Sequence, residues 1–308
     1  MLLDVKHLTI TAEMSKGTKT IVSDLSFSLA KGERLAVVGE SGCGKTMTAM
    51  SVMGLLPANC KATGEIVFDG TDLLSRRGAR KLHTLRGEKI MLVPQSGGEF
   101  LNPSIRISTQ IYESLRKRGV RGRNALRAAA RGLLREVGLS DAEEILDKYP
   151  FQLSGGQAQR VVLAIAASGD AELVIADEPT KGIDEETAQL FLGKIDELFP
   201  SAAVIIITHN VRVASDCDKT LVMYKGEIME YGDTRSVLGN PSHPYTQSLI
   251  AALPDRGFGV YPRLRDPSPA GCVFSDRCPH ADDECFAAKP VSVNRDGTVR
   301  RCFRAECR

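Results

Sequence analysis

A glycine-rich loop at residues 39–46 carries the clearest chemistry in this sequence, because it ends in a lysine and a hydroxyl side chain. The pattern G-x-x-x-x-G-K-[ST] follows an apolar run and opens a helical stretch, which is the context of a phosphate-binding loop. Its backbone N–H groups would surround phosphates, Lys45 would reach the β- and γ-phosphates, and the Thr46 hydroxyl would bind Mg²⁺. An accidental glycine-rich turn is the alternative. The expected nucleotide-binding residues are Gly39, Glu40, Ser41, Gly42, Cys43, Gly44, Lys45 and Thr46.

A second glycine-rich helix start, Leu-Ser-Gly-Gly-Gln at residues 153–157, needs its own explanation, because one nucleotide needs only one phosphate-binding loop. Ser154 is a good N-cap residue, and the two glycines leave backbone N–H groups open to an anion. We therefore expect this segment to bind a nucleotide held by a second subunit, in a head-to-tail pair with two-fold symmetry. A plain N-capped helix is the alternative. The residues concerned are Ser154, Gly155, Gly156 and Gln157.

An Asp-Glu pair closes the apolar run at residues 173–177. A carboxylate at Asp177 can hold the Mg²⁺ shell. Glu178, which should point in a different direction, can polarise an attacking water. A helix cap or a solvated loop would explain such a pair in isolation, but the phosphate-binding loop makes the catalytic interpretation the stronger one.

His209 and Gln95 each follow a short apolar run. In a parallel sheet, side chains after the carboxyl ends of the strands lie at the edge where ligands bind. His209 could then contact the γ-phosphate, and Gln95 could contact Mg²⁺ or the attacking water. A structural histidine and an exposed loop glutamine are the alternatives.

The apolar runs predict an α/β fold in which helices cover both faces of a parallel sheet. We expect two edge strands at about 3–11 and 21–29 and a strand at 34–38 that enters the glycine loop. A helix should follow from residue 45 to about residue 56, where Pro57 ends it.

The 131 residues between Lys45 and Asp177 are too many for a simple crossover, so we expect a helical subdomain inserted at about 96–170. It includes an amphipathic helix at 124–137, whose apolar residues share one face.

From about residue 239 the composition changes to turn-forming residues. We expect a nucleotide-binding domain at 1–238 and a C-terminal extension at 239–308, with the boundary near 238–255 and a short helix at 246–253.

The 308-residue chain has an ordinary globular composition, with 25% charged residues, 43% hydrophobic residues and a net charge of +2. This balance does not indicate a dedicated nucleic-acid binder. The start lacks the basic leader and apolar run of a secretory signal, and the longest apolar stretch is too short to cross a bilayer. We expect a cytoplasmic protein that reaches a membrane through partners.

The motifs occur in the order phosphate-binding loop, Gln95, LSGGQ, Asp177-Glu178 and His209, which resembles the ATPase subunit of an ABC (ATP-binding cassette) system. The resemblance implies a P-loop ATPase with a parallel-sheet core, an antiparallel β edge, the inserted helical subdomain and a small Cys-rich C-terminal domain. It also implies that Asp184 links two nucleotide sites across a dimer, and it favours the functional roles of His209 and Gln95.

The resemblance extends to the ATPases of oligopeptide, dipeptide and nickel importers over nearly the whole chain. It is carried by Leu101-Asn-Pro103 after Gln95, by Pro-Ser-His-Pro-Tyr-Thr at 241–246 and by the cysteine tail that begins at Gly271. It implies ATP-driven import of peptides, nickel or metal–chelator complexes. The implied partners at the cytoplasmic face of the membrane are a second ABC ATPase subunit, two transmembrane permease subunits and, indirectly, an extracytoplasmic solute-binding protein.

Three positions depart from the family pattern. Ala12 stands where an aromatic residue usually stacks on adenine. Asn210 replaces the aspartate that commonly follows the histidine, and Ser-Gly-Gly-Glu at 96–99 replaces the usual start of the glutamine loop. The last change indicates an unusual membrane partner or substrate, because that loop faces the partner.

Five of the eight cysteines lie in the last 37 residues, which in a reducing compartment favours metal binding over disulfides. Four of them are separated by 5, 6 and 16 residues, without the close pairs typical of zinc sites. A [4Fe–4S] cluster is the favoured expectation, as the resemblance also indicates, and zinc is the alternative. Cys307 would be spare and Cys43 a small filler of the phosphate-binding loop. The expected ligands are Cys272, Cys278, Cys285 and Cys302.

The leading functional hypothesis is an importer motor in which Glu178 drives ATP hydrolysis and residues 95–103 transmit the motion. A soluble ABC ATPase of DNA repair or translation is the rival, although such chains usually carry long coiled-coil insertions or two cassettes. A redox-sensing subunit with weak ATPase activity is a third possibility. The basic stretch at 116–135 is expected to be a solvated helix face, ahead of lipid or nucleic-acid binding.

Overall fold

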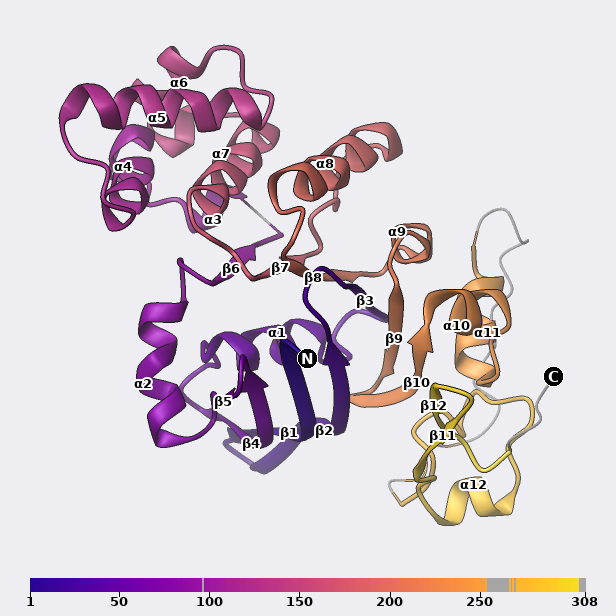
Figure 1. The fold of residues 1–308 in the computed structure, drawn as a ribbon. Helices are drawn as coiled ribbons and strands as arrows, with labels where there is room; N and C mark the ends of the chain where they lie inside the picture. Colours follow the sequence, from indigo (N-terminus) through magenta and orange to yellow (C-terminus); the bar gives the residue numbers. More distant parts are fainter. Residues whose placement is uncertain (96, 254–265, 267, 269, 305–308) are drawn as a thin grey trace. The chain divides into compact units, whose positions relative to one another are not determined.

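The computed structural model describes residues 1–95, 97–253, 266, 268 and 270–304 (Figure 1). The chain forms two compact units. The first unit contains residues 1–80 and 205–308, and the second contains residues 81–204. The predicted domain boundary near 238–255 stays a prediction.

A four-stranded antiparallel sheet forms one part of the first unit (Figure 1). One of its two inner strands, β1 (Leu3–Met14), buries Leu3 and Val5 and, after a register shift, Leu8 and Ile10, which is the alternating pattern of a sheet with one apolar face. This strand, expected at an edge, instead lies between two neighbours, because residues 60–68 pair with its free side; the edge expectation is wrong for it and right for β2. The strands in sheet order are β2 (Gly17–Leu29), β1 (Leu3–Met14), β4 (Cys60–Phe68) and β5 (Thr71–Asp72).

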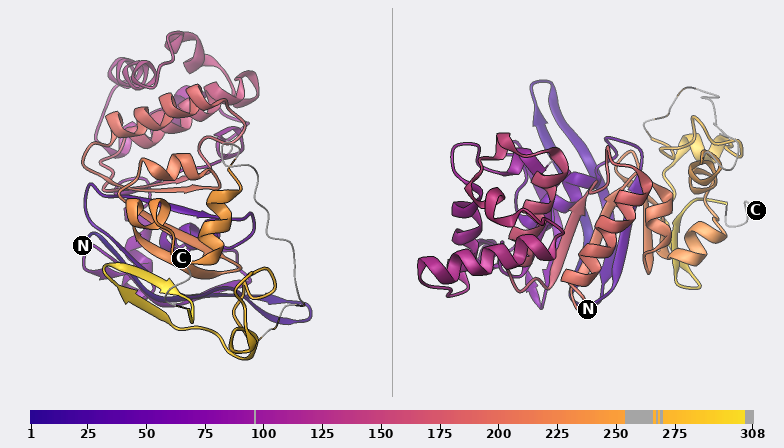
Figure 2. Two further views of the ribbon diagram at one scale, coloured as in Figure 1. Left: turned by 90° about the vertical axis from the view of Figure 1, so that its right-hand side faces the viewer. Right: turned by 90° about the horizontal axis from the view of Figure 1, so that it is seen from above.

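The second sheet of the first unit contains the strand that enters the phosphate-binding loop. This strand, β3, runs parallel to β9, and both are buried along almost their whole length, as the apolar runs predict. The C-terminal hairpin β11–β12, yellow in Figures 1 and 2, pairs antiparallel with β10 and so joins the sheet. The strands in order are β11 (Ser292–Arg295), β12 (Thr298–Arg301), β10 (Glu227–Asp233), β9 (Lys219–Tyr224), β3 (Arg34–Gly39) and β8 (Ala203–Thr208), which begins in the second unit and ends in the first.

Two helices of the first unit differ in length or position from the expectation. Helix α1 (Lys45–Met53) ends before residue 56 because Gly54 adopts a left-handed conformation, with φ of 60°, and caps it. Helix α11 (Pro244–Ala251) begins two residues early because the His243 ring accepts a hydrogen bond from the Tyr245 N–H at 3.0 Å. The other helices are α9 (Val211–Ser215), α10 (Thr234–Gly239), α12 (Asp283–Ala287) and α2 (Arg76–Leu85), which ends in the second unit.

The second unit pairs two parallel strands and carries the inserted helices. The amphipathic helix expected at 124–137 is α5, and it buries Leu126, Ala130 and Leu134 on one face. The strands are β6 (Ile90–Val93) and β7 (Leu173–Asp177). The helices are α3 (Gly97–Phe100), α4 (Ile107–Lys117), α5 (Arg123–Glu136), α6 (Ala142–Asp147), the 3₁₀ turn η1 (Pro150–Gln152), α7 (Gly155–Ala167) and α8 (Glu185–Leu198).

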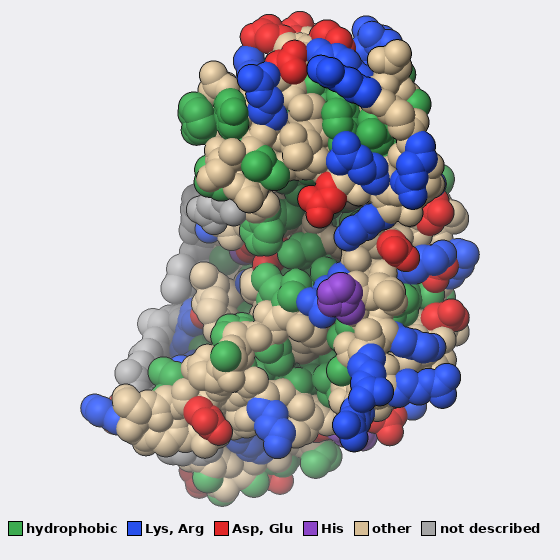
Figure 3. All heavy atoms as spheres, turned by 90° about the vertical axis from the view of Figure 1, so that its left-hand side faces the viewer, with side chains coloured by type: hydrophobic (Ala, Val, Ile, Leu, Met, Phe, Trp, Pro, Cys, Tyr) green, Lys and Arg blue, Asp and Glu red, His purple; other side chains and the backbone are tan. Residues whose placement is uncertain are grey.

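Basic side chains of the inserted helices are matched by acidic ones. Arg127 contacts Glu143 at 2.6 Å and Asp147 at 3.0 Å, and Arg118 contacts Asp170 at 2.5 Å. Figure 3 shows Lys and Arg interspersed with Asp and Glu toward the top of one face. These pairs agree with a solvated, charged helix face. Within the described residues, no helix combines the length and apolar character needed to cross a bilayer.

Candidate nucleotide-binding site

The phosphate-binding loop connects β3 to α1 in the first unit, as the sequence predicts. The Lys45 side chain is buried, and its Nζ donates hydrogen bonds to the carbonyls of Gly39 at 2.8 Å and Glu40 at 3.0 Å. Thr46 is exposed in the first turn of α1, where a hydroxyl can meet a bound cation. Without nucleotide, the Lys45 side chain therefore binds the backbone of the loop itself. It lies next to the N-terminus of α1, where the helix dipole favours anions.

The end of β9 and the turn between β9 and β10 pack directly against the backbone of this loop. The Gly226 N–H donates to the Cys43 carbonyl at 3.0 Å. A Cβ at position 39 would lie 2.1 Å from the Met223 carbonyl, so only glycine permits this approach. The Cys43 thiol is buried, which raises its pKa and keeps it neutral, in agreement with its interpretation as a filler.

His209 and Ala12 also belong to the first unit. His209 is exposed directly after β8, the strand beside β3, and Asn210 caps helix α9 by accepting from the Arg212 N–H at 3.0 Å. Asn210, which replaces the aspartate that is common in the family, therefore has a local structural role as a helix cap. Ala12 is only 4% exposed within β1 and offers no surface for adenine to stack on. The adenine must be held by other residues.

Gln95, Asp177 and Glu178 meet at one edge of the sheet in the second unit. Strands β6 and β7 are parallel and pair Val93 with Ala176, so the residues that follow both strands emerge at the same edge. Asp177 is buried, and Glu178 adopts a left-handed conformation with φ of 47°. This conformation costs a non-glycine residue ~1–3 kcal/mol and is common at functional sites. The backbone therefore leaves the extended conformation of the strand at Glu178, and the separate roles of the two carboxylates stay a prediction.

The LSGGQ segment is an exposed, capped helix start. The Ser154 Oγ accepts from the Gln157 N–H at 3.2 Å, and the Gln157 side chain accepts from the Ser154 N–H at 3.0 Å. This capping box holds α7 in register. Gly155 and Gly156 are exposed beside it, so this face of the helix start can meet a second molecule.

Gln159 is a site residue that sequence reasoning missed. It lies on α7, is 9% exposed, and its amide donates to the Pro179 carbonyl next to Glu178. A Cβ at Gly97 would come 2.6 Å from the Gln159 Cα, so helix α3 of the glutamine loop packs directly on α7. The Gln159 backbone therefore packs against the loop after Gln95, and its buried amide binds the turn after Glu178. A polar glutamine among the apolar residues of a buried helix face is unusual, and this could have indicated from the sequence that Gln159 has a specific partner.

Asp184 caps helix α8. Its carboxylate accepts from the Thr187 N–H at 2.9 Å and from the Thr187 hydroxyl at 2.8 Å, and these hydrogen bonds lower the pKa of Asp184. The side chain is exposed. A role across a dimer stays a prediction. Ser96 lies outside the described residues.

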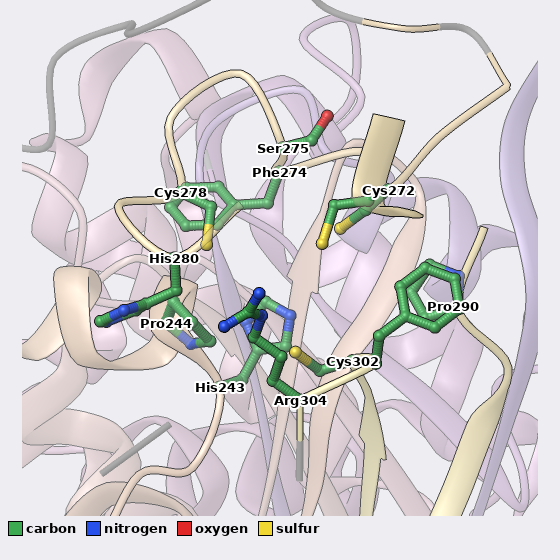
Figure 4. Close-up of a pocket in the computed structure, with 12 residues that line it drawn as sticks. His243, Pro244, Cys272, Phe274, Ser275, Cys278, His280, Pro290, Cys302 and Arg304 are labelled. Carbon is green, nitrogen blue, oxygen red and sulfur yellow. The ribbon is translucent and has the colours of Figure 1, made fainter. Parts of the chain in front are cut away.

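A small cavity in the C-terminal part of the chain is lined by the four cysteines that the sequence singles out. Figure 4 shows the sulfur atoms of Cys272, Cys278 and Cys302 pointing toward the same space. Burial raises the pKa of the Cys278 thiol to about 12 and that of Cys285 to about 11. In the part of the chain that the structure describes, no group of three or more His, Cys, Asp or Glu side chains is placed to hold a single metal ion. Cys307 lies outside that part.

The fold and these motifs define a phosphate-loop ATPase cassette. Residues 22–181 match the ABC transporter family, and residues 229–285 match the oligopeptide/dipeptide transporter C-terminal region. The chain belongs to the ABC transporter family and is an ATP-hydrolysing subunit.

Curated relatives are similar over nearly the whole chain. The oligopeptide transport ATP-binding protein OppD of Salmonella typhimurium is 38% identical, with 99% of this chain and 94% of that protein covered. A putative peptide import ATP-binding protein of Brucella abortus is 37% identical, with 98% and 94% covered.

Solved structures share the fold. A dimeric, post-hydrolysis structure of the ATP-binding cassette MJ0796 with ADP and Pi has a TM-score of 0.67 and 25% identity, covering 76% of this chain and 99% of that one. CbiO1 of Clostridium perfringens has a TM-score of 0.63 at 24% identity, covering 82% and 95%, and shows the fold alone.

Proposed function

We propose that this protein is the motor of a peptide importer and works at the cytoplasmic face of the membrane with two permease subunits. The observation that carries this proposal is the match of residues 229–285 to the oligopeptide/dipeptide transporter C-terminal region. Among the cargoes that the sequence left open, peptides are favoured over nickel and metal chelators, because the relatives are oligopeptide transport and putative peptide import proteins. An extracytoplasmic solute-binding protein would deliver the peptide.

Each ATP is held between two cassettes. The phosphate-binding loop of one subunit binds the triphosphate, and the LSGGQ helix start of the other closes over it. Support comes from the exposed backbone at Gly155 and Gly156 and from the dimeric structure of MJ0796. The oriented N–H groups of a helix start stabilise phosphate charge. The second cassette is either another copy of this chain or a homologue.

Hydrolysis is positioning combined with electrostatics. Glu178 accepts a proton from the attacking water, and His209 contacts the γ-phosphate. The oxygens of Thr46, Gln95 and Asp177 are hard ligands of the kind Mg²⁺ prefers, and the bound ion would neutralise phosphate charge. Asp184 connects the two sites across the dimer.

Motion reaches the permeases through residues 95–103. The contact of Gly97 with α7 supports this route, because a displacement of the LSGGQ helix must move the loop that packs against it.

Copurification and transport test the proposed function. Full-length protein isolated under mild conditions should carry permease subunits, and deletion of its gene should abolish uptake of a labelled oligopeptide. Peptide uptake that survives deletion, or copurification with ribosomes or DNA in place of permeases, would support the soluble ABC ATPase instead.

We further propose that Cys272, Cys278, Cys285 and Cys302 hold a [4Fe–4S] cluster. A buried polar atom beside the thiols fits such a group. The His243 Nδ1 accepts from the Tyr245 N–H, so the proton of the neutral ring is on Nε2, which has no hydrogen-bond partner among the described residues.

Ser275 lines the same cavity and its Oγ is also buried without a hydrogen-bond partner among the described residues, but Figure 4 shows the hydroxyl pointing away from the cysteine sulfur atoms. Burial lowers the pKa of His243 to about 3, so the ring stays neutral. The Arg301 backbone lies near the ring and opposes this shift, without meeting the geometry of a hydrogen bond to Nε2. The N–H of His243 suits the sulfur atoms of a cluster, which would supply a redox-active or structural centre. The cavity is about 20 Å³, so these loops must separate to admit a cluster.

Iron analysis tests the cluster. Protein purified without oxygen should be brown, absorb near roughly 400 nm and contain about four irons per chain. Cys278→Ser should lose most of the iron, whereas Cys60→Ser in the N-terminal sheet should keep it. Colourless wild-type protein with one zinc per chain would establish the alternative metal.

A further inference from the structure

Two segments of the C-terminal extension converge on one residue of the phosphate-binding loop, Glu40. We propose that Arg277 and Tyr245 are positioning residues for this loop and that the C-terminal extension thereby sets the affinity for ATP. This inference rests on ATP binding by the loop and goes beyond it.

The contacts are direct and lie within the first unit. The Arg277 Nη1 meets the Glu40 Oε1 at 2.8 Å, although the two residues are 237 positions apart. The Tyr245 hydroxyl accepts a hydrogen bond from the Glu40 N–H at 3.2 Å. Tyr245 is buried against the rings of Tyr224 and Phe274, with centroids at 4.6 and 5.4 Å. A rigid aromatic cluster therefore fixes the position of this hydroxyl.

ATP binding makes these contacts more important. The Lys45 Nζ holds the loop through the carbonyls of Gly39 and Glu40. An ammonium has three N–H donors, so Lys45 must give up at least one of these bonds to make two to the phosphates. The loop then loses internal hydrogen bonding at the moment when its N–H groups must point at the nucleotide. Tyr245 and Arg277 belong to the C-terminal extension and hold Glu40 independently of Lys45. They can therefore maintain the conformation of the loop when Lys45 binds phosphate.

Charge gives Arg277 a second effect. A carboxylate on a loop that binds a triphosphate repels the ligand. The Arg277 guanidinium, 25% exposed, neutralises Glu40, 47% exposed. Removing the Arg277 guanidinium alone should therefore lower the affinity for ATP more than removing the charges of both Arg277 and Glu40.

Equilibrium ATP binding to the full-length protein tests this inference, with a fluorescent ATP analogue as the probe. Arg277→Gln should weaken binding about three- to tenfold at low ionic strength, and the difference should shrink as salt rises. Glu40→Gln removes the same ion pair without leaving an uncompensated charge, so it should weaken binding less than Arg277→Gln does, and the double variant should bind like Glu40→Gln. Arg277→Lys should retain much of the affinity because it keeps the charge.

Two further variants separate this role from general stability. Lys289→Gln removes a different ion pair of the extension, to Glu227 at 2.5 Å, and should leave ATP affinity unchanged. Tyr245→Phe removes only the hydroxyl and should weaken binding without the salt dependence. The inference would be overturned if Arg277→Gln and the double variant lost ATP affinity equally. It would also be overturned if neither Arg277→Gln nor Tyr245→Phe lost ATP affinity. Failure of wild type itself to bind ATP would refute the proposed function instead.

Discussion

Replacing Glu178 by glutamine is expected to lower ATP turnover by about 10²- to 10⁴-fold while ATP still binds, because the amide cannot accept the proton of the attacking water. The left-handed backbone at Glu178 is kept by the nearly isosteric glutamine, so the loss reflects chemistry rather than folding. The bound ATP should then hold two cassettes together. Phosphate release measures the first effect, and size-exclusion chromatography with ATP measures the second.

The matched control is Glu186→Gln, an exposed glutamate in the first turn of α8. It should hydrolyse ATP at the wild-type rate and form no stable dimer. Wild-type turnover in Glu178→Gln would show that another group accepts the proton, and slow turnover without a dimer would contradict the shared site.

Lys45→Ala should weaken ATP binding about 100-fold or more, because each hydrogen bond to a charged group contributes ~1.5–3 kcal/mol and the lysine supplies at least two. Isothermal titration of the full-length protein measures this loss. Thermal unfolding gives an independent readout, because ATP should raise the Tm of wild type and leave the Tm of Lys45→Ala unchanged.

Lys45 has a second role in the structure, and the unfolding experiment separates that role from phosphate binding. Lys45 also holds the empty loop through the carbonyls of Gly39 and Glu40, so its removal could loosen the loop as well as delete a charge. A Tm without nucleotide close to that of wild type assigns the loss to phosphate binding. Lys31→Ala, which removes an exposed lysine outside the loop, should change neither affinity nor Tm. Normal ATP affinity in Lys45→Ala would refute the role of the loop lysine.

Features with local causes could be predicted from the sequence. The glycine and lysine spacing of residues 39–46 indicated a phosphate-binding loop. Ser154 was expected to cap a helix and does so, and the apolar period over 124–137 matches α5. Each depends on residues within about one or two turns of each other, which is the range over which capping and periodicity act.

Features that depend on distant segments could not be predicted in this way. The inner position of β1 depends on residues 60–68, and the C-terminal hairpin joins the sheet of β3 through β10. The Gln159 amide meets Pro179 twenty positions away. Apolar alternation indicates that a strand has a buried face but does not select its partner.

The sequence by itself determined that this protein is an ATP-hydrolysing member of the ABC transporter family. It also predicts the chemistry of the site: a phosphate-binding loop, a carboxylate pair after a buried strand and an LSGGQ helix start. Only the tertiary structure decided what supports that chemistry. It placed Arg277 and Tyr245 on Glu40 and gathered four cysteines, the first and last of them 30 positions apart, around one cavity. The physical reason is that motif chemistry depends on neighbours along the chain, whereas a contact across 237 positions forms only when the intervening elements have packed.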